Sequence, residues 1–348
     1  MRHLCTLIAW FYFVGPLWAA PGQIETRLTS TSSSGTTALQ SQTSTPSVSN
    51  LNSMISIRSK PLFNDSLVLN ASATRTKNDY AAVILTKENG ELYRLSDSFD
   101  KSETSAEAGL EFSRGPNTWT LSYGQTVGDS PYSFKGGTLA YSRAFFGNTS
   151  AIGGEWVSNT QDLPVTFYDD PSDGFQSKAR PDSLRTRKIS VWFEQILSEK
   201  WKIHSRLLEG QRSDRPEHLG VELRNAYALT DRWFARFDIG YLAEQRRQAL
   251  RDERGYFDIY WLELQTTLEP LYGFLVTASA GTTVERETIP DSRPQGLRAR
   301  RSQYGLDVYG LRLNYKGRRW TAGLLGQVGT SNTSYRSTSY GGHFIWEI

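Results

Sequence analysis

Long segments in which every second residue tends to be apolar recur along this sequence from about residue 66. In 233–245, for example, Ala235, Phe237 and Ile239 alternate with the more polar Arg236, Asp238 and Gly240. A period of two is typical of strands that have one apolar face. Many of these segments run for about 10–13 residues, whereas soluble strands usually have about five or six and strands that cross a membrane at a tilt need about 9–11. Segment length therefore favours strands that span a membrane.

The connections between these segments alternate in length. Tight breaks such as 115–117, 198–200 and 230–232 alternate with longer polar stretches, of which 159–186 and 285–302 are the longest. Short turns at one end and long loops at the other are typical of outer-membrane barrels. A soluble β-sandwich, in which the apolar faces of two sheets meet, also explains the alternation within strands, but it gives no reason for the asymmetry of the turns.

We therefore expect an all-β fold: a transmembrane antiparallel up-and-down β-barrel of about 14–16 strands within 66–348. The strand count stays open because the candidate strands at 66–75, 80–87 and 91–97 have the weakest alternation. The mean hydropathy of −0.48 excludes a bundle of apolar membrane helices. It does not exclude a barrel, because barrel strands are apolar on one face only.

The N-terminus has the layout of a secretory signal peptide. A short basic start precedes an apolar run from Leu4 to Leu17, and the small residues Ala19 and Ala20 follow. A single membrane anchor is the alternative, but the run is shorter than the ~20 residues that a span needs. We expect residues 1–19 to be a cleaved signal. Residues 20–65 are rich in serine and threonine, which predicts a flexible periplasmic leader before the barrel.

Composition narrows the classes of function. A net charge of +3 gives no reason to expect a nucleic acid as partner. The only cysteine, Cys5, lies in the expected signal peptide, so the mature chain would have no disulfide and no thiol nucleophile. No zinc-ligand spacing and no glycine-rich phosphate loop stands out. We expect neither a cofactor nor a bound metal.

Tryptophans recur at one place in the pattern, directly after a tight turn. Trp233 follows the polar break 230–232, and three other short turns are followed in the same way. Indole settles at the boundary between lipid and water, where barrels have a girdle of aromatic residues. A general preference of aromatics for strand ends is the alternative. The expected girdle residues are Trp119, Trp201, Trp233 and Trp320.

The last residues, STSYGGHFIWEI, end in alternating apolar positions. Gly341, Phe344 and Trp346 match a terminal-strand signal of the form polar–x–Gly–x–x–apolar–x–apolar, although that signal usually ends in an aromatic residue and Ile348 stands here. In this respect the sequence resembles the porin-like β-barrel proteins of the Gram-negative outer membrane. The resemblance implies an outer-membrane location, contact with its lipid and lipopolysaccharide, and insertion by the barrel-assembly machinery. It identifies no particular family and no oligomeric state.

If the apolar faces meet lipid, the polar faces line the lumen. Glu222 and Arg224 on one strand would then lie near Arg236 and Asp238 on the next. A barrel of about 14 or more strands is too wide for side chains to fill, so we expect a hydrated or loop-plugged lumen. A salt-bridge lattice that only braces the wall is the alternative. The expected pore-lining residues are Lys202, Arg206, Glu222, Arg224, Arg236, Asp238 and Arg312.

Two sets of charged residues lie in the expected long loops. Asp169, Asp170 and Asp173 would narrow the lumen if their loop folded inward, or would hold Ca²⁺ weakly; a solvated surface loop is the plainer alternative. Clustered arginines bind phosphate well, which suggests lipopolysaccharide or an anionic solute as ligand unless they only keep the loops soluble. These arginines are Arg246, Arg247, Arg251, Arg298, Arg300 and Arg301.

A channel or porin for polar or anionic solutes is the function that these features favour. The alternative is a non-conducting barrel that binds lipopolysaccharide or a partner protein through its arginine-rich loops. A barrel lipid hydrolase is a third hypothesis, because 204–206 has a histidine and a serine, the pair that outer-membrane phospholipases use. His204 falls on the lumen side of its strand, however, so we expect no enzyme activity.

Overall fold

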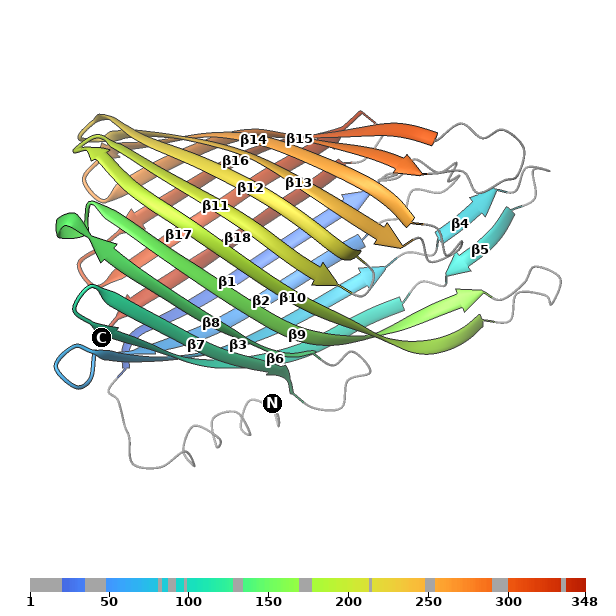
Figure 1. The fold of residues 1–348 in the computed structure, drawn as a ribbon, viewed down its shortest axis with the longest axis horizontal. Helices are drawn as coiled ribbons and strands as arrows, with labels where there is room; N and C mark the ends of the chain where they lie inside the picture. The colour runs from blue at the N-terminus through green and yellow to red at the C-terminus, as the bar shows by residue number, and fades with distance from the viewer. Residues whose placement is uncertain are drawn as a thin grey trace.

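The computed structural model describes residues 21–34, 48–80, 83–86, 92–96, 99–127, 134–168, 177–212, 215–247, 254–289, 300–332 and 336–348. Sixteen of its strands form one closed antiparallel barrel (Figure 1), in which nearly every strand pairs with its neighbours in the chain. The wall strands are β1 (Pro21–Ser34), β2 (Val48–Ser59), β3 (Leu67–Tyr80), β6 (Phe99–Arg114), β7 (Asn117–Thr126), β8 (Phe134–Phe145), β9 (Ser150–Tyr168), β10 (Ser177–Ser198), β11 (Trp201–Arg212), β12 (Arg215–Thr230), β13 (Trp233–Arg247), β14 (Arg254–Leu271), β15 (Phe274–Ile289), β16 (Arg300–Lys316), β17 (Trp320–Ser331) and β18 (Arg336–Glu347).

Pairing of the first and last strands closes the wall. β1 pairs with β18 from Gln23 opposite Glu347 to Ser34 opposite Arg336, and it pairs with β2 on its other edge. The expected all-β antiparallel barrel is confirmed, at the upper end of the expected strand count.

Tight turns gather at one end of the barrel, where β1 begins and β18 ends (Figure 1). Only two residues separate the strands at 115–116, 199–200, 231–232 and 272–273. Gly115 and Gly273 have positive φ values of 58° and 77°, a conformation that glycine adopts without the steric cost of a Cβ atom. The expected asymmetry of the connections is therefore present.

At the opposite end, strands continue through segments that we expected to be loops. β9 and β10 stay paired as far as Tyr168 opposite Ser177, so most of the expected loop 159–186 is a long hairpin that continues beyond the neighbouring strands (Figure 1). Polar residues suggest a loop from sequence, but backbone hydrogen bonds can extend a hairpin into water without an apolar face. Asp169, Asp170 and Asp173 lie outside the described residues.

The prediction of a flexible leader at 20–65 is wrong for the residues that form β1 and β2. Their serines and threonines suit this wall for two reasons: threonine is β-branched and favours strands, and lumen-facing positions need no apolar side chain. Outward positions still carry Leu28, Leu51 and Ile55, which are 54%, 44% and 43% exposed. The barrel therefore begins at Pro21 rather than at residue 66, and the expected signal peptide at 1–19 lies outside the described residues.

The weakly patterned segment 66–97 accounts for a second difference. Its first part is β3, a wall strand, whereas β4 (Val83–Thr86) and β5 (Leu92–Ser96) pair only with each other in a separate two-stranded sheet. The two strands that this removes from the expected wall are replaced by β1 and β2. The expected upper count of 16 wall strands is therefore correct, but two of the expected strands, 80–87 and 91–97, are not part of the wall.

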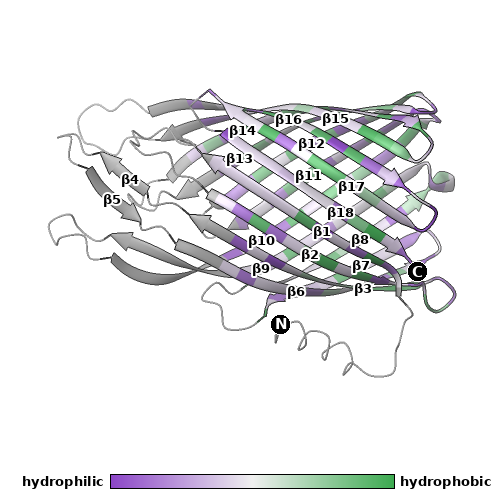
Figure 2. Cartoon of the chain, turned by 180° about the vertical axis from the view of Figure 1, so that it is seen from behind, coloured by the Kyte–Doolittle hydropathy of each residue, from purple (hydrophilic) through white to green (hydrophobic). Residues whose placement is uncertain are grey.

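The two faces of the wall have opposite character. Large apolar side chains such as Leu262, Leu264 and Tyr309 lie exposed on the outward face, and Figure 2 shows the apolar segments mainly in the half of the barrel nearer the C-terminus. Among the described residues, only Val68 and Phe257 are both apolar and buried. A soluble sandwich would bury its apolar faces against each other, so this structure contradicts the sandwich alternative.

Candidate functional site

The lumen face of β9–β14 has three groups of ion pairs, which we call the lattice, and we call this part of the barrel the ionic wall. Arg206 Nη2 on β11 lies 2.7 Å from Glu155 Oε2 on β9 and donates a hydrogen bond to Ser190 Oγ on the strand between them. Ser190 is 1% exposed. Contact between β9 and β11 across β10 requires the concave side of the wall, because there side chains of alternate strands converge. Arg206 therefore lies in the lumen.

A second group of ion pairs follows on β12–β14. Arg224 Nε lies 3.0 Å from Asp238 Oδ2, and Arg236 Nε lies 3.2 Å from the same oxygen. Arg236 also reaches Glu263, with Nη2 and Oε2 at 3.7 Å. The Asp238 side chain is only 11% exposed, so this carboxylate is the shared centre of two guanidinium groups.

A third group is nearer the tight turns. Lys202 Nζ lies 2.8 Å from Glu194 Oε1, and His204 Nδ1 lies 3.7 Å from the second oxygen of the same carboxylate. In the three groups, four acidic side chains face four lysines or arginines, so the permanent charges balance. They are Glu155, Glu194, Asp238 and Glu263, and Lys202, Arg206, Arg224 and Arg236.

The neighbouring strands β7 and β8 form a different surface, which we call the hydroxyl wall. Apart from Phe134 at the start of β8, their lumen positions have small or hydroxyl-bearing side chains, and none of the described ones is charged. Thr118 Oγ1 lies 3.1 Å from Ser113 Oγ on β6, and Thr118 pairs with Ser142. The lumen residues of this wall are Thr118, Thr120, Ser122, Gly124, Thr126, Phe134, Gly136, Thr138, Ala140, Ser142 and Ala144.

Of the seven residues expected to line the pore, five belong to the lattice. The expected proximity of Glu222 and Arg224 to Arg236 and Asp238 is also present, because Arg224 is paired with Asp238. Glu222 lies directly between Arg206 and Gly240 in the strand pairing. Arg312 is separate, on β16 between Thr277 and Leu325.

Sequence reasoning missed Glu155 and two lumen tryptophans, Trp192 and Trp261. Both tryptophans break the alternation, because they occupy the polar register of β10 and β14. Each indole lies over a glycine on the adjacent strand, Gly153 or Gly240 respectively. The sequence signal that could have identified these lumen tryptophans is a large aromatic residue at a position of the strand that is otherwise polar, opposite a glycine on the next strand.

The four expected girdle residues lie on the outward face near the tight turns. Trp119, Trp201, Trp233 and Trp320 are 37%, 42%, 45% and 39% exposed. The ring centroid of Trp119 is 5.3 Å from that of Tyr141, and Trp320 is equally close to Tyr315. Trp233 Nε1 donates a hydrogen bond of 2.7 Å to Thr266 Oγ1.

The C-terminal residues complete the wall through β18. Phe344 and Trp346 point outward, 43% and 52% exposed, and the Ile348 amide donates to the Gly22 carbonyl at 3.0 Å. A Cβ atom at Gly341 would lie 2.5 Å from the Leu28 carbonyl oxygen. Glycine therefore permits close approach of β18 to β1 at the point where the barrel closes.

The arginines of the expected anion-binding set are described only in part. Arg251 and Arg298 lie outside the described residues, as the three aspartates do. Arg246 and Arg247 end β13, and Arg300 and Arg301 begin β16, with only their backbone described. Anion binding by these arginines therefore remains a prediction.

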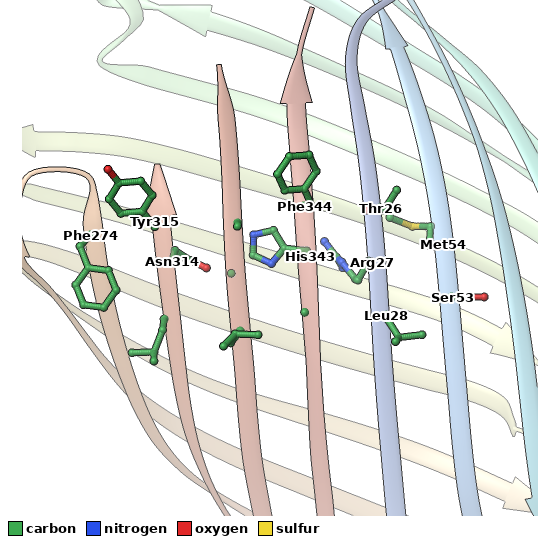
Figure 3. Close-up of a pocket in the computed structure, with 15 residues that line it drawn as sticks. Thr26, Arg27, Leu28, Ser53, Met54, Phe274, Asn314, Tyr315, His343 and Phe344 are labelled. Carbon is green, nitrogen blue, oxygen red and sulfur yellow. The ribbon is translucent and has the colours of Figure 1, made fainter. Parts of the chain in front are cut away.

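A shallow hollow of about 710 Å³ is lined by residues of β1, β2 and β15–β18 (Figure 3). The aromatic residues Phe274, Tyr315 and Phe344 and the small residues Ala322 and Gly342 belong to its lining, which is mainly apolar. Arg27, Asn314 and His343 also belong to its lining.

Other kinds of site are not found in the described part of the chain. There, no group of three or more histidine, cysteine, aspartate or glutamate side chains could hold a metal ion, and no helix is long and apolar enough to cross a membrane. His204 and Ser205 occupy successive positions of β11 and so point to opposite faces. They therefore cannot form the serine–histidine pair of the hydrolase hypothesis.

No family model matches the sequence, and no curated protein matches it significantly. Solved structures do match its fold. A structure described as a bacterial polysaccharide outer membrane secretin is 12% identical, with 93% of this chain and 98% of that chain covered and a TM-score of 0.52. CdiB from Acinetobacter baumannii is 10% identical, with a TM-score of 0.50 over 93% of this chain. This chain spans 60% of the length of CdiB. The protein thus has the fold of the bacterial outer-membrane β-barrels.

Proposed function

We propose that this protein is an outer-membrane channel for polar solutes. The observation that supports the proposal most is the contrast between an exposed apolar outward face and a lumen wall of paired charges and hydroxyl groups. Barrels with about 16 strands are wide enough to leave an aqueous channel. The fold match to a polysaccharide outer membrane secretin is consistent with passage of large polar molecules.

The balanced charges of the three groups of ion pairs favour uncharged polar solutes over anionic ones. Each described acid of the lattice neutralises at least one basic group, so the lattice exerts little net field on a passing ion. Such a lattice also braces the wall, and both roles are compatible. No residue of the lumen is assigned a catalytic role.

Conductance of the purified protein in planar lipid bilayers tests the channel proposal. We expect discrete conductance steps with weak selectivity between K⁺ and Cl⁻. Protein that has inserted, as judged by heat-modifiable gel mobility, and that conducts no current at any voltage would contradict the proposal.

Binding of lipopolysaccharide is a second candidate function, which an arc of basic residues favours. On β10 the outward apolar positions end at Ile189, and Arg187 and Arg185 follow; on β3, Arg75 and Lys77 follow Ala73 in the same way. These positions are where lipid phosphates would lie if the apolar band spans the membrane. Guanidinium groups bind phosphate strongly.

This candidate can be tested by titrating the detergent-purified protein with lipid A. We expect R75Q/R187Q to weaken binding severalfold, whereas R319Q, at the tight-turn end, should leave it unchanged. Equal affinity of the two variants would remove this candidate.

A further inference from the structure

One row of paired residues crosses the ionic wall and has a tryptophan at each end. Trp192 on β10 pairs with Arg206, Arg206 with Glu222, Glu222 with Gly240, and Gly240 with Trp261 on β14. Residues paired in this way point to the same face of the sheet. All five positions therefore face the lumen, and we call them the Trp192–Trp261 row.

The indoles lie along the wall rather than across the lumen. The atoms nearest to a Cβ built on Gly153 are Cε2, Cζ2 and Nε1 of Trp192, and those nearest to a Cβ on Gly240 belong to the six-membered ring of Trp261. Each ring thus occupies the space above a glycine of the neighbouring strand. Both tryptophans are still partly exposed, so part of each apolar surface faces the lumen.

Hydrogen-bonding groups lie between and beyond the two rings. Arg206 and Glu222 occupy the middle of the row, and Arg224 and Asp238 lie beside them on β12 and β13. The row continues onto the hydroxyl wall through Gly153 to Ser142 and Thr118. Four strand spacings of about 4.8 Å separate the tryptophans, a span of roughly 19 Å.

This arrangement suits a solute that has both apolar ring faces and many hydroxyl groups along its edge. A sugar ring stacks its C–H face on an aromatic ring and uses its hydroxyls as donors and acceptors. A span of roughly 19 Å accommodates several sugar units in a row. An ionic ligand would need an excess of opposite charge, whereas the lattice around the row has balanced charges.

We infer that the Trp192–Trp261 row is a binding track for a linear, uncharged oligosaccharide. This inference rests on the proposed channel function, because it names the class of solute that the lumen would take. A purely structural role for the indoles, filling the notches above Gly153 and Gly240, predicts no sugar binding.

Two measurements test the track. Purified protein in planar bilayers is exposed to maltohexaose, to chitohexaose and to the anionic hexagalacturonate, and the same ligands are titrated into detergent-solubilised protein by calorimetry. We expect at least one neutral hexasaccharide to bind and to block the current transiently, more strongly than hexagalacturonate does. W192L and W261L should each shorten the blockades and weaken binding by about five- to tenfold, because leucine keeps apolar volume but offers no flat ring.

The control variant is W156L, which removes an indole from the outward face of β9, where Trp156 is 47% exposed. It should bind sugar as the parent does. W192F should retain more affinity than W192L, because phenylalanine keeps an aromatic face. Heat-modifiable gel mobility verifies that every variant is folded.

The outcomes separate this inference from the channel proposal. A protein that conducts but binds neither neutral hexasaccharide would overturn the track and leave the channel intact. A protein that does not conduct, but binds a neutral hexasaccharide in calorimetry with the expected loss in W192L, would overturn the channel and keep the track. Equal binding by W192L, W261L and the parent would overturn the track.

Discussion

The ionic wall and the hydroxyl wall are adjacent parts of one sheet, yet only their outward faces are alike. Trp119 and Leu121 on β7 and Phe237 and Ile239 on β13 are all large, apolar and exposed. On the lumen side, β13 presents Arg236 and Asp238, whereas β7 presents Thr118 and Thr120. The outward face therefore needs apolar side chains on both walls, whereas the residues of the lumen face are free to differ between them. Information about function is concentrated in that variable face.

The sharpest test of this comparison is to remove the carboxylate that two arginines share. In D238N, Arg224 and Arg236 lose the counter-charge that lies 3.0 Å and 3.2 Å away. Arg236 keeps Glu263 at 3.7 Å, whereas Arg224 loses the one acid it is paired with above, and loss of the partner of a partly buried charged group costs about 1–3 kcal/mol. We expect that loss in the free energy of unfolding, measured by urea titration in lipid vesicles.

The matched change on the hydroxyl wall is S122A, which removes one neutral hydroxyl. Substitutions away from buried networks usually change stability by about 0.5 kcal/mol or less. If S122A and D238N cost the same, the ionic wall does not brace the barrel more than the hydroxyl wall does.

The barrel itself could be predicted from sequence because the outward residues, which are every second residue of a strand, are mostly apolar. Alternation, strand length and tight turns predicted strands such as β13 and the position of Trp233. Alternation is a weak signal where a strand has few large apolar residues. For this reason the serine-rich segments that form β1 and β2 are predicted from sequence to be a flexible leader. In these strands, pairing with β18 and β3 settles the structure, and pairing between distant segments is not visible in the local pattern.

The candidate site could be predicted only in part for the same reason. The pairing of Arg224 with Asp238 joins strands that are adjacent in sequence, so a hairpin register suffices to find it. Arg206 and Glu155 are separated by a whole strand and a long hairpin, and the registers of β9–β11 together with the curvature of the wall bring them together. Trp192 breaks the alternation of β10, but its glycine partner Gly153 depends on the β9–β10 register.

A smaller loss in the free energy of unfolding is expected when a glycine beneath a lumen tryptophan is replaced by alanine. In G240A the new methyl group would occupy the space of the Trp261 ring, and overpacking of this kind costs about 1–3 kcal/mol unless the ring moves. Because Trp261 is partly exposed, we expect the lower end of that range in urea titration.

The matched position on the hydroxyl wall is Gly124, where an added Cβ would lie 3.3 Å from the Ala106 carbonyl oxygen. G124A should cost less than G240A. The reverse order would mean that the Trp261 ring does not depend on the space above Gly240.

The smallest expected effect is on ion selectivity. E263Q leaves the three groups of ion pairs with one excess positive charge, because Glu263 is one of their four acids. We expect a modest shift of the reversal potential toward Cl⁻ in a KCl gradient, larger at low salt because screening is weaker there. T120V on the hydroxyl wall changes no charge and should leave the reversal potential unchanged.

Accessibility of successive residues along β13 tests most directly whether lipid lies on one face and water on the other. Single cysteines are placed at each position from 235 to 241 in a chain in which Cys5 is replaced by serine, and the protein in lipid vesicles is treated with a charged, membrane-impermeant thiol reagent. We predict rapid labelling at 236, slower labelling at 238 and 240, where neighbouring lumen side chains cover the wall, and protection at 235, 237, 239 and 241. Uniform labelling of all seven positions would contradict a membrane-spanning barrel, and uniform protection would contradict a hydrated lumen.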